Sequence, residues 1–287
     1  MLTLDNATLS GVRRLLAEKG LRPHKGLGQN FLVDKNILQK IAAASECTKN
    51  DVVLEIGAGL GALTLCLAEL AGRVVAVEID KKLIPILEKE FESRPNITLV
   101  SGDILALDWE QEFFGFLKSP QDKIIICANL PYYITSPVIF KILEHRKRIK
   151  QAVLMVQREV AERLLARPGN RDYGLITVNV NRLAEVEMIA RVSRNCFYPS
   201  PEVDSAVIRL IPRSRPPVVV ENEEVFTELV KAAFQARRKT MLNVLVSRNL
   251  ADREKAMEVL LSLGVDPNRR GETLSVEDFA QIANRLS

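Results

Sequence analysis

Asn129-Leu130-Pro131-Tyr132-Tyr133 is the stretch of this sequence whose residue types best suit chemistry on a nucleobase. Pro131 has no backbone N–H and favours an extended conformation at Leu130, so we expect the Leu130 carbonyl to stay free as an acceptor. Asn129 supplies a second neutral acceptor, and Tyr132 supplies an aromatic face. Two acceptors beside an aromatic ring suit the exocyclic amino group of a base. Taken alone, the pentapeptide is equally typical of an ordinary Asn-X-Pro turn.

Such a site favours alkylation of an adenine amino nitrogen, a weak nucleophile because its lone pair is delocalised into the ring. Hydrogen bonds from both of its N–H groups to Asn129 and Leu130 would favour a more tetrahedral nitrogen and stabilise the developing positive charge. A methyl group held in line would then transfer without a strong general base. The donor with a ribose and an adenine to bind is S-adenosylmethionine. The target base must leave its stack, and Tyr132 and Phe197 are candidate faces for it. Burial of Phe197 in the core is the alternative for that residue.

Four predicted strands place polar residues at one edge of a sheet. Apolar, β-branched runs at 52–56, 73–77, 97–100 and 123–128 indicate buried strands with helices between them. The residues that follow these strands are Gly57, Glu78, Asp103 and Asn129. The carboxyl ends of parallel strands meet at one edge, where ligands bind. Glu78 lies 21 residues after Gly57, the offset at which an acid binds the ribose of a nucleoside cofactor, although a helix cap is the structural alternative. Asp103 is positioned to hold an adenine amino group.

The remaining pattern predicts a fifth strand at 152–156 and an antiparallel pair at 185–192 and 205–210, whereas 173–183 fits either a helix or a strand. Helices are predicted at 10–19, 62–71, 81–91 and 136–144, and Asp34 is a plausible N-cap for another. A Pro-Arg-rich linker at 212–217 precedes purely helical periodicity. We therefore expect an α/β domain over residues 1–212 and a small all-helical domain over 213–287.

Composition bounds the function without fixing it. The chain has 287 residues, a formal charge of +4, four scattered cysteines and two histidines. The cysteines show no metal-ligand spacing, so we expect reduced thiols and no metal site. No apolar run is long enough to span a membrane, and residues 1–5 lack a signal pattern, so we expect a cytoplasmic protein. Basic clusters at 13–25 and 145–150 have a structural explanation, as solvated surface or helix ends, and a nucleic-acid one.

An ordered set of motifs resembles a known family. The motifs are 27–32 (LGQNFL), 55–61 (EIGAGLG), 129–133 (NLPYY), 159–163 (EVAER), 197–205 (FYPSPEVDS) and 234–240 (FQARRKT), with Glu78 and Asp103. From about residue 25 to the C-terminus, the sequence resembles the ribosomal RNA adenine dimethyltransferases. It is most similar to the small-subunit (16S rRNA) enzymes whose loss gives kasugamycin resistance.

The resemblance implies a Rossmann-like class I methyltransferase sheet, mostly parallel with one antiparallel strand. It also implies dimethylation of two adjacent adenosines in a hairpin near the 3′ end of 16S rRNA, within a late small ribosomal subunit, by a monomer. The residues that it assigns to the methyl donor are Gln29, Asn30, Leu32, Gly57, Glu78, Asp103 and Asn129. Those that it assigns to the adenine are Asn129, Leu130, Pro131 and Tyr132, with Phe197 stacking on the base.

Two other functions stay open at this stage. One is a large-subunit 23S rRNA methyltransferase of the macrolide-resistance type, which the complete helical tail disfavours. The other is a non-catalytic assembly or nucleic-acid-binding factor built on a methyltransferase fold, which the intact set of Glu78, Asp103, Asn129 and Tyr132 disfavours. Glu202 departs from the family pattern, where a Lys is expected in many relatives, and this affects only an expected contact to the RNA backbone.

Overall fold

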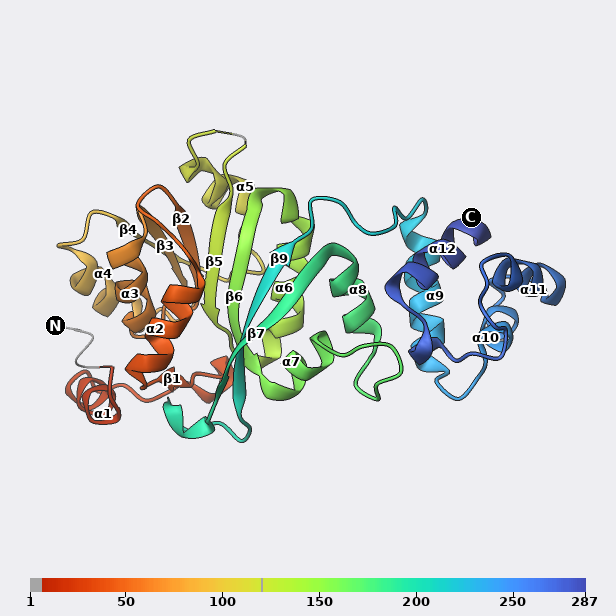
Figure 1. Cartoon of the computed structure of the whole chain (residues 1–287). Helices are drawn as coiled ribbons and strands as arrows, with labels where there is room; N and C mark the ends of the chain where they lie inside the picture. The colour runs from red at the N-terminus through yellow and green to blue at the C-terminus, as the bar shows by residue number, and fades with distance from the viewer. Residues whose placement is uncertain (1–6, 120) are drawn as a thin grey trace. The chain divides into compact units, whose positions relative to one another are not determined.

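The computed structural model describes residues 7–119 and 121–287, so the expectation about residues 1–5 lies outside the described part (Figure 1). The chain divides into two compact units, the first formed by 1–161 with 187–212 and the second by 162–186 with 213–287. The segment 162–186, which the sequence analysis assigned to the first domain, thus groups with the helical C-terminal region. No helix in the described residues is long and apolar enough to cross a bilayer.

A seven-stranded sheet forms the centre of the first unit, in the order β4-β3-β2-β5-β6-β9-β7. Its strands are β2 (Val52–Ile56), β3 (Arg73–Glu78), β4 (Ile97–Ser101), β5 (Ile124–Asn129), β6 (Ile149–Gln157), β7 (Ala184–Val192) and β9 (Ser205–Pro212). Strands β2 to β6 pair in parallel, and β9 runs antiparallel to β6. The order reverses next to β2, which creates the switch point where α/β sheets bind ligands. This is the sheet that the resemblance implied.

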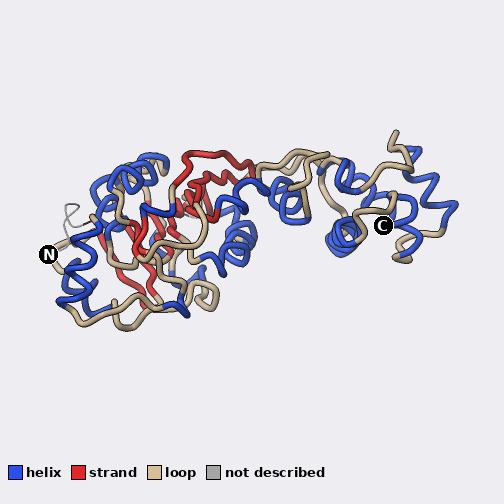
Figure 2. The backbone as a smooth tube through the Cα atoms, turned by 90° about the horizontal axis from the view of Figure 1, so that it is seen from below, coloured by secondary structure: helices blue, strands red, loops and turns tan. Residues whose placement is uncertain are grey.

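Helices cover both faces of this sheet, as Figure 2 shows for the strands in red and the helices in blue. They are α2 (Lys35–Ala44), α3 (Ala62–Leu70), α4 (Ile84–Phe91) and α6 (Thr135–Glu144), whereas α1 (Leu9–Glu18) contacts β8 (Phe197–Tyr198) and α5 (Trp109–Glu112) lies beside His145 at the end of α6. Apolar side chains of α2 and α3, such as Ile41 and Leu67, share one core cluster with Val53 and Ile125 of the sheet. Asp34 caps α2, as predicted, because its carboxylate accepts from the N–H groups of Asn36 and Ile37.

The structure decides one open helix prediction and corrects another. The segment that fitted either state forms α8 (Leu175–Leu183). Helix α4 begins at Ile84, so the predicted start at residue 81 was wrong. The Asp80 carboxylate accepts from the Lys82 N–H at 3.0 Å and holds a turn before the helix.

The basic cluster at 145–150 has a structural role. The His145 ring stacks on Trp109 with centroids 5.1 Å apart, and the Arg148 guanidinium lies 5.2 Å from the centre of the Phe114 ring. A guanidinium over an aromatic face, as at Arg148, stabilises a fold by ~0.5–2 kcal/mol. Of the two explanations for this cluster, its position at the end of α6 (Thr135–Glu144) and these ring contacts support the structural one.

The second unit is helical and has its own core. It contains α8, α9 (Glu223–Gln235), α10 (Met241–Ser247), α11 (Arg253–Ser262) and α12 (Val276–Leu286), and α7 (Arg158–Leu164) runs into it. Phe226, Leu260 and Phe279 are fully buried in one cluster. The buried Arg182 guanidinium pairs with both carboxylate oxygens of Glu223 at 2.9 and 2.7 Å, which fastens α8 to α9.

Candidate active site

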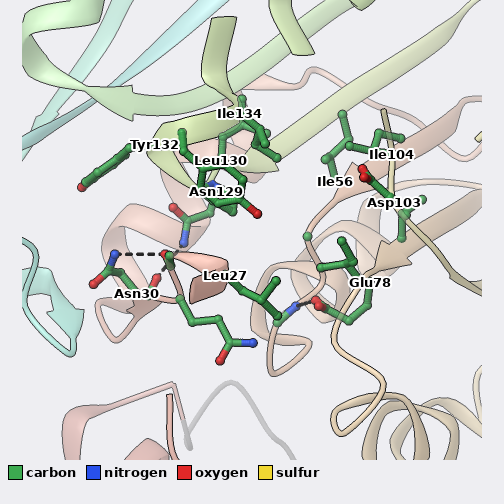
Figure 3. Close-up of a pocket in the computed structure, with 18 of the residues that line it drawn as sticks. Leu27, Asn30, Ile56, Glu78, Asp103, Ile104, Asn129, Leu130, Tyr132 and Ile134 are labelled. Atoms are coloured by element: carbon green, nitrogen blue, oxygen red, sulfur yellow. Dashed lines mark hydrogen bonds between the residues drawn. The ribbon is translucent and has the colours of Figure 1, made fainter. Parts of the chain in front are cut away.

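A pocket of about 180 Å³ opens at the carboxyl edge of the parallel strands (Figure 3). Gly57 follows β2, Glu78 ends β3, Asp103 follows β4 and Asn129 ends β5. The structure brings ten of the eleven predicted site residues to its lining: Gln29, Asn30, Gly57, Glu78, Asp103, Asn129, Leu130, Pro131, Tyr132 and Phe197. Leu32 does not line this pocket; it borders a smaller adjoining cavity. Parallel strand order therefore gathers Gly57 and Asn129, which lie 72 positions apart in the sequence.

The Asn129 carboxamide is oriented by the N-terminal segment of the chain. Its Nδ2 donates a hydrogen bond to the backbone carbonyl of Asn30 at 3.1 Å. The Asn30 side chain in turn donates to the Gly28 carbonyl at 3.1 Å (Figure 3). Because the amide nitrogen is engaged by Asn30, the Asn129 Oδ1 is left as the acceptor for an incoming N–H group.

The Leu130 carbonyl supplies the second acceptor. The Leu130 N–H donates to the Met155 carbonyl of β6 at 3.3 Å, which attaches the start of the loop to the sheet. In the described part of the chain the Leu130 carbonyl itself accepts no hydrogen bond. Pro131 follows with φ −56° and ψ 133° and has no backbone N–H. Two neutral oxygens on adjacent residues thus border one pocket.

Two aromatic residues flank these acceptors. The Tyr132 hydroxyl hydrogen-bonds the Ser205 Oγ at 2.8 Å, which fixes the ring, and burial raises the pKa of this phenol. Phe197 is only 4% exposed and packs in the core beneath the pocket while one part of its surface faces the cavity. The structure thus shows the core burial of Phe197, and its stacking on a base stays a prediction.

The Glu78 carboxylate is buried at the end of β3 and organises the glycine-rich turn. Its two oxygens accept from the backbone N–H of Gly59 at 2.7 Å and of Asp80 at 2.8 Å. Gly59 has φ +57°, a left-handed conformation that glycine adopts at low cost. Burial raises the pKa of Glu78, while these N–H groups favour its ionised form. Each carboxylate oxygen keeps a second lone pair, so Glu78 can still accept from a ribose hydroxyl.

The loop before β1 closes the pocket from the N-terminal side. The Gln29 amide is engaged at both ends: Nε2 donates to Asp80 at 2.8 Å, and Oε1 accepts from the His24 N–H at 2.8 Å. Its side chain therefore holds the loop against the end of β3. Strand β1 (Phe31–Leu32) pairs antiparallel with β8 (Phe197–Tyr198), so Leu32 lies opposite Phe197. This two-stranded pairing places Asn30 and Phe197 at the same site.

A family model described as ribosomal RNA adenine dimethylase matches residues 20–287. The chain belongs to the ribosomal RNA adenine dimethylase family. The proteins named ribosomal RNA small subunit methyltransferase A from Moorella thermoacetica and Geobacillus thermodenitrificans are 49% and 45% identical to it. Each alignment covers 98% of this chain, with 98% and 97% of the respective relative.

Two solved structures of related enzymes are also similar. A dimethyladenosine transferase from Plasmodium falciparum has a TM-score of 0.74 at 31% identity, with 87% of this chain and 94% of that one covered. The 23S rRNA methyltransferase ErmE has a TM-score of 0.69 at 30% identity, with 90% and 99% covered. The expected family and sheet are confirmed, and with the family come the enzyme class and the methyl donor.

Sequence reasoning missed several apolar residues that line this dimethylase pocket. Ile79, Ile104 and Leu105 follow Glu78 and Asp103 directly and line the cavity beside them. An adenine needs apolar contacts on its faces as well as an acceptor for its amino group. The position of these residues just after an acid at a strand end could therefore have identified them as lining residues. Glu55, the first residue of the motif 55–61, is 1% exposed in β2, and the sequence analysis did not predict that its carboxylate is buried.

Proposed function

We propose that this chain transfers methyl groups from S-adenosylmethionine to the exocyclic amino groups of two adjacent adenosines near the 3′ end of 16S rRNA. The observation that carries the proposal is the pair of neutral acceptors, Asn129 Oδ1 and the Leu130 carbonyl, beside the pocket aromatics. The family model and the small-subunit names of the relatives support the same reaction and substrate.

The residues present suit the methyl donor, which supplies a sulfonium-bound methyl group when bound. Glu78 accepts from the ribose hydroxyls, and the free oxygen of Asp103 accepts from the donor adenine. Ile79 and Ile104 supply apolar contacts to that ring, and the positive φ of Gly57 and Gly59 lets the backbone approach closely. We also propose that Gln29, Asn30 and Leu32 belong to the donor site. Gln29 and Leu32 hold the loop that covers the donor.

At the reacting nitrogen, the protein orients the amine and stabilises charge. The amino group donates to Asn129 Oδ1 and to the Leu130 carbonyl, so its lone pair turns out of the ring plane towards the donor. Preorganised acceptors of this kind stabilise the transition state because they need no reorganisation as positive charge develops. Tyr132 and Phe197 hold the base out of its stack. Pro131 keeps the Leu130 carbonyl free, and the proton leaves to solvent after the nitrogen–carbon bond forms.

The full-length relatives named for the small subunit support 16S rRNA as the partner. We propose that the chain acts on it as a cytoplasmic monomer, within a late assembly particle. The test is incubation of the protein with labelled donor and undermethylated small subunits, followed by mapping of the modified nucleosides. We expect N6-dimethyladenosine at two neighbouring positions, no label in large subunits, and labelling that is about 100-fold slower after Asn129→Ala. Label only in large subunits would favour the ErmE-like alternative, and no label in either would favour a non-catalytic assembly factor.

A further inference from the structure

Tyr133 is an aromatic residue at the pocket that the proposed chemistry leaves without a role. Its side chain lines the cavity and is 58% exposed, the highest value among the exposed large hydrophobic residues that the structure describes in the first unit. In the described part of the chain it makes no hydrogen bond and no ring contact. The neighbouring aromatics differ: Tyr132 is held by Ser205, and Phe197 is almost fully buried.

The backbone beneath this ring is fixed. Tyr133 is the middle residue of a 3-10 turn over Tyr132–Ile134, closed by a hydrogen bond from the Ile134 N–H to the Pro131 carbonyl at 3.1 Å. The ring also rests against Gly28, since a Cβ added at Gly28 would lie 3.5 Å from its Cδ1 and Cε1 atoms. An aromatic ring on a rigid turn loses little entropy when it stacks on a ligand, which makes it an effective platform.

We propose that Tyr133 is a stacking platform for the base that neighbours the adenosine in the pocket. This inference rests on the proposed function. Tyr133 directly follows Tyr132, and both side chains line the pocket, with most of the Tyr133 side chain exposed to solvent. When one of two adjacent adenosines enters beside Tyr132, the chain must leave through the mouth of the pocket, where the second base meets Tyr133.

The platform gives Tyr133 a part in modifying both adenosines. Stacking on an exposed aromatic ring is independent of base identity, so it holds either neighbour while the other reacts. Retention of the second adenosine at the mouth favours its methylation before the particle is released. Loss of the platform therefore weakens binding of the RNA to the protein and lowers the yield of the doubly modified product. Binding of the methyl donor is unchanged.

The test compares Tyr133→Ala and Tyr133→Phe with a matched control, Phe140→Ala. Phe140 is also an exposed aromatic residue (41%), on α6 and outside the pocket lining. For each variant, methylation of the two adenosines is followed separately over time at limiting enzyme on undermethylated small subunits. Binding of sinefungin is measured by calorimetry, and thermal unfolding checks the fold.

We expect Tyr133→Ala to raise KM for the particle about tenfold with kcat retained, and to accumulate particles modified at one adenosine only. Tyr133→Phe and Phe140→Ala should match the wild type, and sinefungin affinity should be the same in all. Equal time courses for Tyr133→Ala and wild type would overturn the platform. So would a loss of sinefungin affinity in Tyr133→Ala, which would make the ring a support for the Gly28 loop. A wild-type protein that methylates neither adenosine would instead refute the proposed function.

Discussion

Replacement of Glu55 by glutamine should make the first unit more stable at alkaline pH. Glu55 lies in β2 between β3 and β5, is 1% exposed, and in the described part of the chain its Oε2 has no hydrogen-bond partner. Burial raises the pKa of this carboxyl from 4.5 to about 8, and the nearby charge of Glu78 acts in the same direction. The folded protein thus keeps Glu55 protonated at neutral pH.

The sign and size of the effect on the free energy of unfolding follow from proton linkage. The unfolded chain loses the Glu55 proton above pH 4.5, whereas the folded chain keeps it to about pH 8, so unfolding releases a proton in this window. The contribution of Glu55 to the free energy of unfolding is fully present below pH 4.5. It falls by about 1.4 kcal/mol per pH unit as the pH rises towards 8. The whole effect is at most about 5 kcal/mol. Glutamine has nearly the same shape and no proton to lose, so Glu55→Gln removes this dependence.

The single tryptophan makes the assay specific to this unit. Trp109 is the only tryptophan of the chain, is 1% exposed and belongs to the first unit, so its fluorescence reports unfolding there. Urea midpoints of wild type, Glu55→Gln and the exposed control Glu69→Gln are compared from pH 5 to pH 8.5. We expect Glu55→Gln to match the wild type at pH 5 and to exceed it at pH 8, with Glu69→Gln following the wild type. Equal pH slopes in all three proteins would mean that Glu55 is ionised in the fold.

Four further substitutions separate catalysis, donor binding, stability and RNA contact. Asn129→Ala should lower the single-turnover methylation rate by about 100-fold, since it removes one preorganised acceptor, while particle binding persists in a filter assay. Glu78→Ala should weaken sinefungin binding by about tenfold or more in calorimetry, and an unchanged affinity would remove the ribose assignment. Arg237→Ala should lower the thermal stability of the second unit because its guanidinium holds Glu272 and the Tyr173 carbonyl. Arg238→Ala should reduce the salt slope of particle binding by about one, and an unaltered slope would show that Arg238 contacts no phosphate.

The elements that carry the donor site could be predicted because their signals are local. The run 52–56 is apolar and β-branched, and it forms β2 with the predicted bounds. Gly57, Glu78 and Asn129 each stand at a strand end, and parallel strands bring their ends together regardless of sequence distance. The role of a side chain was harder to predict where it depends on a hydrogen-bond partner that is distant in the sequence. Arg237 belongs to the motif 234–240, and no local pattern indicates that its guanidinium donates to the carbonyls of Arg171 and Tyr173 within the helical unit.

The pairing of β1 with β8, on which the geometry of the site depends, could not be predicted from the sequence. Two-residue strands such as β1 and β8 are too short for periodicity, and they join Leu32 to Phe197 across more than half of the chain. The same segment carries Asn30, whose carbonyl receives the Asn129 amide and thereby turns Oδ1 towards the pocket. The acceptor on β5 and the aromatic on β8 are thus set by one N-terminal segment that touches both. Displacement of that segment removes the orientation of Asn129 and the support of Phe197 together, even with every catalytic side chain intact.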